Sequence, residues 1–240
     1  MGSADGALIE ARDVVRRYGG RGGLVAVRGA SLSIHERDFV AFMGPSGSGK
    51  TTFLGVLAGL DRPEEGEVRW KGQRFDRLPP EQMLELRRRR MGIVFQSFGL
   101  LPTLSAVENV ELPMRVAGGE LEETRERAVG WLTKLGLSDR LENRTFELSA
   151  GQQQRVAVAR ALITEPDVVL ADEPIAEVDT ENADIILEAL WDVVRRGGSV
   201  VAATHNPEAV RYANRVVLFR DGQVEADGVP ADLASHLTTD

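Results

Sequence analysis

The chain has 240 residues, a net charge of −8, no cysteine and three histidines. These values argue against general nucleic-acid binding, exclude disulfides, thiol nucleophiles and cysteine-based zinc sites, and make a histidine-rich metal site unexpected. No apolar run approaches the roughly 20 residues of a membrane span, and the N-terminus lacks a signal-peptide pattern, so we expect a cytosolic protein without direct membrane insertion.

Short apolar strands alternate with helical patterns, which is typical of a parallel α/β sheet with crossover helices. The expected strands are residues 8–14, 25–34, 38–43, 66–70, 92–95, 167–171, 199–203 and 215–220. Asp221-Gly222 predicts a hairpin turn into a last strand at 223–226.

The strand pattern disappears between residues 97 and 166, where three helices are expected. They span 103–117, 120–135 and 149–163, and Pro113 should kink or end the first of them.

We therefore expect a single domain over residues 1–240 that consists of a core and an inserted lobe. Residues 1–96 and 165–240 form the catalytic core, and residues 97–164 form the helical lobe.

A glycine-rich loop follows the third expected strand and leads into an apolar helical stretch. Glycines let several backbone N–H groups converge on a triphosphate, a lysine places its ammonium beside the β- and γ-phosphates, and a threonine hydroxyl ligates Mg²⁺. The sequence GPSGSGKTT matches G-x-x-x-x-G-K-[ST] and predicts ATP and Mg²⁺ binding. Its residues are Gly44, Pro45, Ser46, Gly47, Ser48, Gly49, Lys50, Thr51 and Thr52.

Two acids, Asp172 and Glu173, end an apolar run that begins at Val168. Such a run is typical of a strand covered on both faces, and open α/β sheets bind ligands at the carboxyl ends of their strands. An ordinary solvated loop explains two acids equally well. The phosphate-binding loop favours a functional site over a solvated loop, because a nucleotide-hydrolysing site also needs a carboxylate that binds Mg²⁺ and a group that activates water. We expect Asp172 to hold Mg²⁺ with Thr51, and Glu173 to be the general base.

Further segments resemble motifs of ATP-binding cassette (ABC) ATPases. ELSAGQQQRVAVARAL at 147–162 is similar to the signature motif. Tyr18 in VVRRYGG resembles the aromatic residue that stacks on adenine. Gln96 in GIVFQSF resembles the Q-loop glutamine, and His205 in VAATHNP the switch histidine. FQSFGLLPTLSAVENVELPM, LTKLGLSDR and ELSAGQQQR are most similar to lipoprotein-releasing, macrolide-exporting and cell-division cassettes of the LolD, MacB and FtsE types.

The resemblance implies an α/β P-loop NTPase fold, with a RecA-like core, an antiparallel β subdomain and the inserted α-helical subdomain of ABC ATPases. It also implies that Gln96 and His205 act in catalysis with Glu173, and that Gln96 joins Thr51 and Asp172 as a Mg²⁺ ligand.

A homodimer that binds two ATP head to tail is also implied. In that dimer Ser149, Gly151 and Gln152 of one subunit cap the γ-phosphate held by Lys50 of the other, and Asp179 belongs to the same interface. Ser149 is a suitable N-cap for its helix, so its hydroxyl and the helix dipole would face an anion.

Two departures from the family pattern fall at this interface. Ala150 stands where glycine is usual, and IAEV at 175–178 replaces a small polar stretch, which places Ile175, Ala176 and Glu177 at the expected subunit contact. Asp179 is retained, and we expect hydrolysis to survive.

Three functions remain open from the sequence. The first is an ATPase subunit that energises a separate FtsX-like or MacB-like permease from the inner face of the membrane. The second is an ATPase that drives transmembrane mechanical signalling, such as control of wall hydrolases in cell division. The third, a soluble cassette acting on DNA or ribosomes, fits the acidic charge poorly, and a small-molecule kinase would not need the signature helix.

Two surface features have competing explanations. The run LRRRRMG at 86–92 suggests nucleic acid or anionic lipid, but after PPEQMLE it is better explained as the solvated end of a helix. An apolar cluster after Gln96 suits either a groove for a permease helix or ordinary core packing. Its members are Phe98, Leu100, Leu101 and Leu104.

Overall fold

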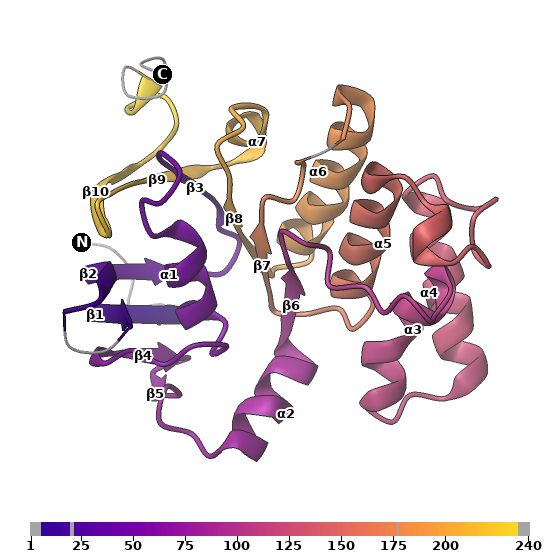
Figure 1. Ribbon diagram of the computed structural model, residues 1–240, viewed down its shortest axis with the longest axis horizontal. Helices are drawn as coiled ribbons and strands as arrows, with labels where there is room; N and C mark the ends of the chain where they lie inside the picture. The colour runs from indigo at the N-terminus through magenta and orange to yellow at the C-terminus, as the bar shows by residue number, and fades with distance from the viewer. Residues whose placement is uncertain (1–5, 20–21, 177, 235–240) are drawn as a thin grey trace.

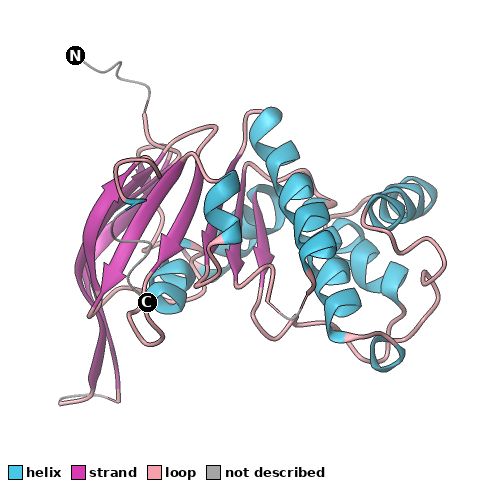
Figure 2. Cartoon of the chain, turned by 90° about the horizontal axis from the view of Figure 1, so that it is seen from above, coloured by secondary structure: helices cyan, strands magenta, loops and turns pink. Residues whose placement is uncertain are grey.

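The computed structural model describes residues 6–19, 22–176 and 178–234. Its strands form two sheets, with a group of helices beyond the edge of the larger sheet (Figures 1 and 2). The smaller sheet is antiparallel in the order β2-β1-β4-β5. Its strands are β1 (Ile9–Tyr18), β2 (Leu24–Ile34), β4 (Glu65–Trp70) and β5 (Gln73–Arg74).

The larger sheet has the order β10-β9-β3-β8-β7-β6 and is parallel except for its edge strand β10. Its strands are β3 (Phe39–Met43), β6 (Met91–Val94), β7 (Val168–Asp172), β8 (Ser199–Ala203), β9 (Arg215–Arg220) and β10 (Gln223–Gly228). Every residue of β3, β7 and β8 is buried, as their continuous apolar runs predict. Asp221 and Gly222 have φ of 50° and 81° and form the predicted β9–β10 hairpin turn.

The described residues form seven α-helices and a short 3-10 helix at Thr145–Glu147. The α-helices are α1 (Lys50–Leu57), α2 (Pro80–Arg90), α3 (Ala106–Val116), α4 (Leu121–Lys134), α5 (Ala150–Leu162), α6 (Thr180–Arg195) and α7 (Glu208–Tyr212). Between β6 and β7 the chain forms α3, α4 and α5, which lie together on the right of Figure 1. Among the described helices, none has both the length and the apolar character that crossing a bilayer requires.

The two faces of β3 point into two apolar cores. Val40 and Phe42 pack in a core with α1 and the antiparallel sheet, whereas Phe39 and Ala41 belong to a core that includes α3, α5 and α6. This alternation follows from the two-residue period of a strand. It fixes β3 between the two layers, so the loop that follows β3 opens at the carboxyl edge of the sheet.

Helix boundaries differ from the prediction where capping side chains intervene. The helix predicted at 103–117 begins at Ala106, because Ser105 and Glu108 form a capping box in which the Glu108 N–H donates to the Ser105 hydroxyl at 3.3 Å. Pro113 lies inside α3 and does not end it, since the helix continues to Val116.

The arginine run forms the last turn of α2, as predicted, where cations are favoured by the helix dipole. One of the four, Arg87, is turned inward and donates a hydrogen bond of 2.7 Å to the carbonyl of Gly59. Burial lowers the pKa of Arg87.

Candidate nucleotide site

The phosphate-binding loop lies between β3 and α1 and folds around the side chain of Lys50. The Lys50 ammonium donates hydrogen bonds to the backbone carbonyls of Gly44 at 2.6 Å and Pro45 at 3.0 Å, and contacts the Ser48 hydroxyl at 3.4 Å. All three acceptors are uncharged oxygens. A phosphate above the loop would therefore be a stronger partner for this ammonium than its present ones.

Two glycines allow the loop to adopt this shape. Gly49 has φ of 104°, and a Cβ atom there would lie 2.4 Å from the carbonyl oxygen of Ala26. At Gly44 φ is 143°, and a Cβ atom would lie 2.1 Å from the carbonyl oxygen of Phe219. Helix α1 begins after Gly49, which provides no side-chain cap, so an anion can accept hydrogen bonds from the first N–H groups of the helix.

Thr51 and Asp172 connect the loop to the end of β7. The Thr51 hydroxyl donates a hydrogen bond of 3.1 Å to Asp172 Oδ1. Burial raises the pKa of Asp172, partly offset by this hydrogen bond, and burial likewise lowers the pKa of Lys50, partly offset by the charges of Glu173 and Asp172. Each buried group would gain from a partner of opposite charge.

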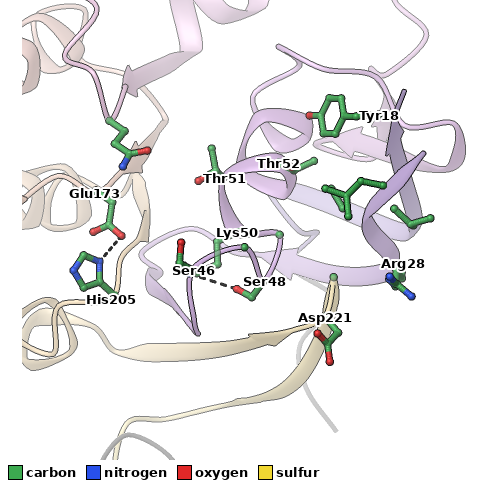
Figure 3. Close-up of a pocket in the computed structure, with 17 residues that line it drawn as sticks. Tyr18, Arg28, Ser46, Ser48, Lys50, Thr51, Thr52, Glu173, His205 and Asp221 are labelled. Atoms are coloured by element: carbon green, nitrogen blue, oxygen red, sulfur yellow. Dashed lines mark hydrogen bonds and ion pairs between the residues drawn. The ribbon is translucent and has the colours of Figure 1, made fainter. Parts of the chain in front are cut away.

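Glu173 follows β7 with φ of 49° and presents its carboxylate at the edge of the cavity (Figure 3). Its Oε1 lies 2.7 Å from His205 Nδ1, and its Oε2 accepts a hydrogen bond of 2.9 Å from the Thr204 hydroxyl. The Glu173 N–H donates to the carbonyl of Ala203 at 2.8 Å. The backbone and both carboxylate oxygens are thus held, while lone pairs remain on the carboxylate for a water molecule.

A cavity of about 610 Å³ opens over the loop, within the size range of small-molecule sites (Figure 3). The predicted residues that line it are Tyr18, Ser46, Gly47, Ser48, Gly49, Lys50, Thr51, Thr52, Gln96, Glu173 and His205. The lining residues that the sequence did not reveal are Leu24, Val25, Ala26, Arg28, Asp221 and Gly222. Asp221 and Gly222 carried only a turn signal, and the other four lie on β2 or at its start, whose approach to the loop depends on tertiary structure.

Tyr18, at the end of β1, is held at two points. Its hydroxyl donates a hydrogen bond of 2.8 Å to Asp61 Oδ2. The Arg16 guanidinium lies 4.8 Å from the centroid of the Tyr18 ring and donates to the same Asp61 oxygen at 2.8 Å. A 42% exposed ring fixed in this way is a rigid platform on which a base can stack.

The predicted signature residues lie at the N-terminus of α5. Ser149 is the N-cap, as predicted: its hydroxyl accepts from the Gln152 N–H at 3.3 Å, and its own N–H donates to Gln152 Oε1 at 2.9 Å. Asp179 caps α6 in a similar way by accepting from the Asn182 N–H at 2.9 Å. In the described part of the chain, neither these residues nor Gly151 line the cavity.

The prediction that Ile175 presents an apolar side chain at a subunit contact is wrong. Ile175 is only 2% exposed and packs in the core that includes α5 and α6. The apolar side chain is therefore explained by burial within its own subunit. Ala176 is half-buried, and Glu177 lies outside the described residues.

The segment after Gln96 turns sharply. Phe98 and Gly99 both have positive φ, 62° and 61°. Arg160 of α5 donates to both of their carbonyls, at 2.7 Å to Phe98 O, and burial lowers the pKa of this arginine. The signature helix is thereby tied to the segment that carries Gln96.

Fold and site together define a P-loop NTPase. A glycine loop follows strand β3 and leads into α1, which carries Lys50 and Thr51, while the carboxylate of Asp172 ends a strand of the same sheet. The family model described as ABC transporter matches residues 27–176. The chain therefore belongs to the ABC transporter family of ATP-binding domains, and it is an ATPase of that family.

Similar proteins are known by sequence and by structure. The chain is 46% identical over 200 residues to an uncharacterized ABC transporter ATP-binding protein of Thermotoga maritima, which covers 83% of this chain and 86% of that protein. It is 44% identical over 224 residues to the macrolide export ATP-binding/permease protein MacB of Syntrophobacter fumaroxidans, covering 92% of this chain but 31% of MacB. The chain thus spans about a third of the length of its MacB relatives.

A solved structure shows the same fold. The dimeric ATP-binding cassette MJ0796, in a post-hydrolysis state bound to ADP and Pi, superposes with a TM-score of 0.88 at 38% identity, covering 92% of this chain and 98% of that one.

Proposed function

We propose that this ATPase energises a separate membrane permease by closing as a homodimer on two ATP molecules and reopening after hydrolysis. The observation that carries the proposal is the division of the site within one chain. Lys50, Thr51 and Glu173 surround one cavity, whereas the helix end capped by Ser149 lies away from it. A second helix N-terminus reaches the bound ATP only if a partner subunit supplies it. The dimeric state of the ADP- and Pi-bound relative supports this arrangement.

In the proposed reaction, the oxygen of a water molecule attacks the γ-phosphorus of ATP as Glu173 accepts its proton. The bond from the γ-phosphorus to the bridging oxygen breaks, which gives ADP and phosphate. The Lys50 ammonium stabilises the negative charge on the phosphate oxygens. His205 holds the Glu173 carboxylate from the solvent side, and Gln96 lines the same cavity.

Thr51 and Asp172 fit a magnesium ion that arrives with ATP, because both offer the oxygen ligands this ion prefers. In the described ranges, no cluster of three or more histidine, aspartate or glutamate side chains could hold a metal alone. Mg²⁺ is usually held by one or two protein oxygens, with phosphates and water as the other ligands. Gln96 is the third proposed ligand. Bound Mg²⁺ would neutralise charge on the β- and γ-phosphates.

The permease is proposed to be FtsX-like or MacB-like, which places this chain peripherally on the inner face of the membrane. The relatives named as macrolide and pyoverdine export ATP-binding/permease proteins support export over mechanical signalling. The apolar cluster after Gln96 offers a contact: Leu101 is 44% exposed and Phe98 and Leu104 are half-buried, whereas Leu100 packs against the core.

Trapping the closed dimer tests this function. A tagged Glu173→Gln variant, purified from detergent-solubilised membranes with Mg-ATP, should elute as a dimer, hydrolyse ATP at least about 100-fold more slowly than wild type, and bring a permease with it. Wild type without nucleotide is the control. Hydrolysis at the wild-type rate would contradict the role of Glu173, and absence of any membrane protein would contradict the permease.

A further inference from the structure

The Thr204 hydroxyl is a buried polar group that touches the catalytic carboxylate. Thr204 directly follows β8, is 0% exposed, and donates a hydrogen bond of 2.9 Å to Glu173 Oε2. From this geometry we propose that Thr204 is a positioning residue, which fixes the Glu173 carboxylate in the orientation that accepts the proton of the attacking water. The inference rests on the proposed function of Glu173.

Thr204 is itself anchored on two other sides. Its backbone N–H donates to the carbonyl of Phe42 on β3 at 3.0 Å, and its hydroxyl oxygen accepts from the Asn206 N–H at 3.0 Å. A hydroxyl has a single proton. The contact with Asn206 does not use that proton, because Thr204 is the acceptor there, and the proton is donated to Glu173 Oε2. The core of the parallel sheet is thus connected to the carboxylate through one side chain.

The other contact of the carboxylate cannot fix it as firmly. His205 binds Oε1 from a side chain that is 75% exposed. The last torsion of a glutamate side chain is broad, so a single contact with an exposed side chain does not by itself fix the carboxylate plane. The hydrogen bond from Thr204 to Oε2 restricts rotation of that plane. The Glu173 carboxylate then keeps its orientation toward the attacking water even when His205 changes partners during ATP hydrolysis.

Substitution of Thr204 separates positioning from binding. Thr204→Val keeps the shape and removes the donor, and Thr204→Ala does the same with a smaller side chain should valine prevent folding. We expect kcat to fall about 10- to 100-fold while KM for ATP changes less than about twofold, because the carboxylate acts on water and not on the bound nucleotide. Thr204→Ser restores the donor and should recover most of kcat.

Two controls sharpen the test. Thr124 in α4 is also 0% exposed, but its hydroxyl has no hydrogen-bond partner among the described residues, so Thr124→Val makes the same chemical change far from Glu173 and should leave kcat unchanged. In a Glu173→Gln background, Thr204→Val should cause no further loss. The rate of Glu173→Gln alone tests the proposed function separately.

The inference is overturned if folded Thr204→Val and Thr204→Ala keep kcat within about twofold of wild type, or if Thr204→Ser is as slow as Thr204→Val. A further loss of similar size in the Glu173→Gln background would also overturn it, because Thr204 would then act independently of the carboxylate.

Discussion

The N-termini of α1 and α5 are both proposed to meet the phosphates of ATP, yet they are built in opposite ways. Helix α1 begins after Gly49 in a left-handed conformation and has no side-chain cap. Helix α5 begins with a complete capping box, in which Ser149 and Gln152 satisfy each other's N–H groups. The first end is open to an anion, whereas at the second end two N–H groups already have partners within the chain.

The difference suggests an order of events. Phosphate binding at α1 completes hydrogen bonds that the folded chain leaves open, so a single subunit can bind ATP. At α5 the Ser149 hydroxyl accepts from the Gln152 N–H, so its own proton remains available to donate to a phosphate while the cap stays intact. Because Ser149 lies away from the cavity of its own chain, it meets a phosphate only in the proposed closed dimer, which favours ATP binding first and closure second.

The largest effect is expected at α1. Lys50→Met should lower ATP hydrolysis at least about 100-fold and also weaken ATP binding by the isolated subunit, because the phosphates lose their main cation. Equilibrium binding of a fluorescent ATP analogue and phosphate release measure the two losses. If Lys50→Met binds ATP with wild-type affinity, the N-terminus of α1 is not the site at which a single subunit binds the phosphates, and the proposed difference from α5 is wrong.

Lys50→Met should lower activity without lowering the stability of the folded protein. The pKa of Lys50 lies below its ordinary value of 10.5 because burial disfavours the ammonium. Its charge therefore costs stability below the folded pKa, and this cost disappears as pH rises above 10.5. At pH 7 the apo Lys50→Met protein should unfold at a temperature no lower than wild type.

The second effect is expected at α5. Ser149→Ala should leave ATP binding by the single subunit within about twofold of wild type but slow hydrolysis about 10-fold, since in the proposed dimer this hydroxyl meets a phosphate only on closure. Loss of the cap should also cost about 1 kcal/mol of unfolding free energy. Ser105→Ala is the matched control, because Ser105 forms the same type of capping box on α3. If both variants slow ATP hydrolysis equally, the effect of Ser149→Ala is explained by the lost helix cap alone and not by contact with a phosphate.

A smaller effect is expected where α5 meets the loop after Gln96. Arg160→Lys removes one arm of the fork that binds two consecutive carbonyls, and should cost about 1 kcal/mol and lower permease-stimulated hydrolysis about fivefold. Arg155 offers a control on the same helix, because it donates to the carbonyls of Leu135 and Gly136 in the helical lobe. Arg155→Lys should lower stability but leave permease-stimulated hydrolysis unchanged. Chemical denaturation measures the stability of each variant, and an ATPase assay with the reconstituted permease measures the stimulated hydrolysis.

The smallest effect concerns the adenine end. Asp61→Ala releases the Tyr18 hydroxyl and leaves Arg16 with Glu64 alone as its carboxylate partner, so KM for ATP should rise about threefold with kcat unchanged. Arg17→Ala, on the same strand but paired with Glu64, is the control. A change in kcat without a change in KM would show that the platform acts on chemistry and not on binding.

The sequence by itself determined the features whose physics is local. The loop around Lys50 needs glycines at fixed spacing, Ser149 caps its helix through Gln152 three residues later, and Asp221-Gly222 forms a two-residue turn. The strand ending at Asp172 was evident because a fully covered strand is continuously apolar. Each of these features is specified by a few consecutive residues, so a pattern suffices to find it.

Only the tertiary structure decided which distant side chains meet. The contacts of Thr204 with Glu173 and of Asp61 with Tyr18 join segments 31 and 43 residues apart, and a lone threonine or aspartate carries no signal of its partner. Ile175 was assigned to a subunit contact and proved to be core, because an apolar side chain is compatible with either environment. Packing of the two sheets around β3 brings these segments together, and that packing depends on the sum of many burial energies and not on any short motif.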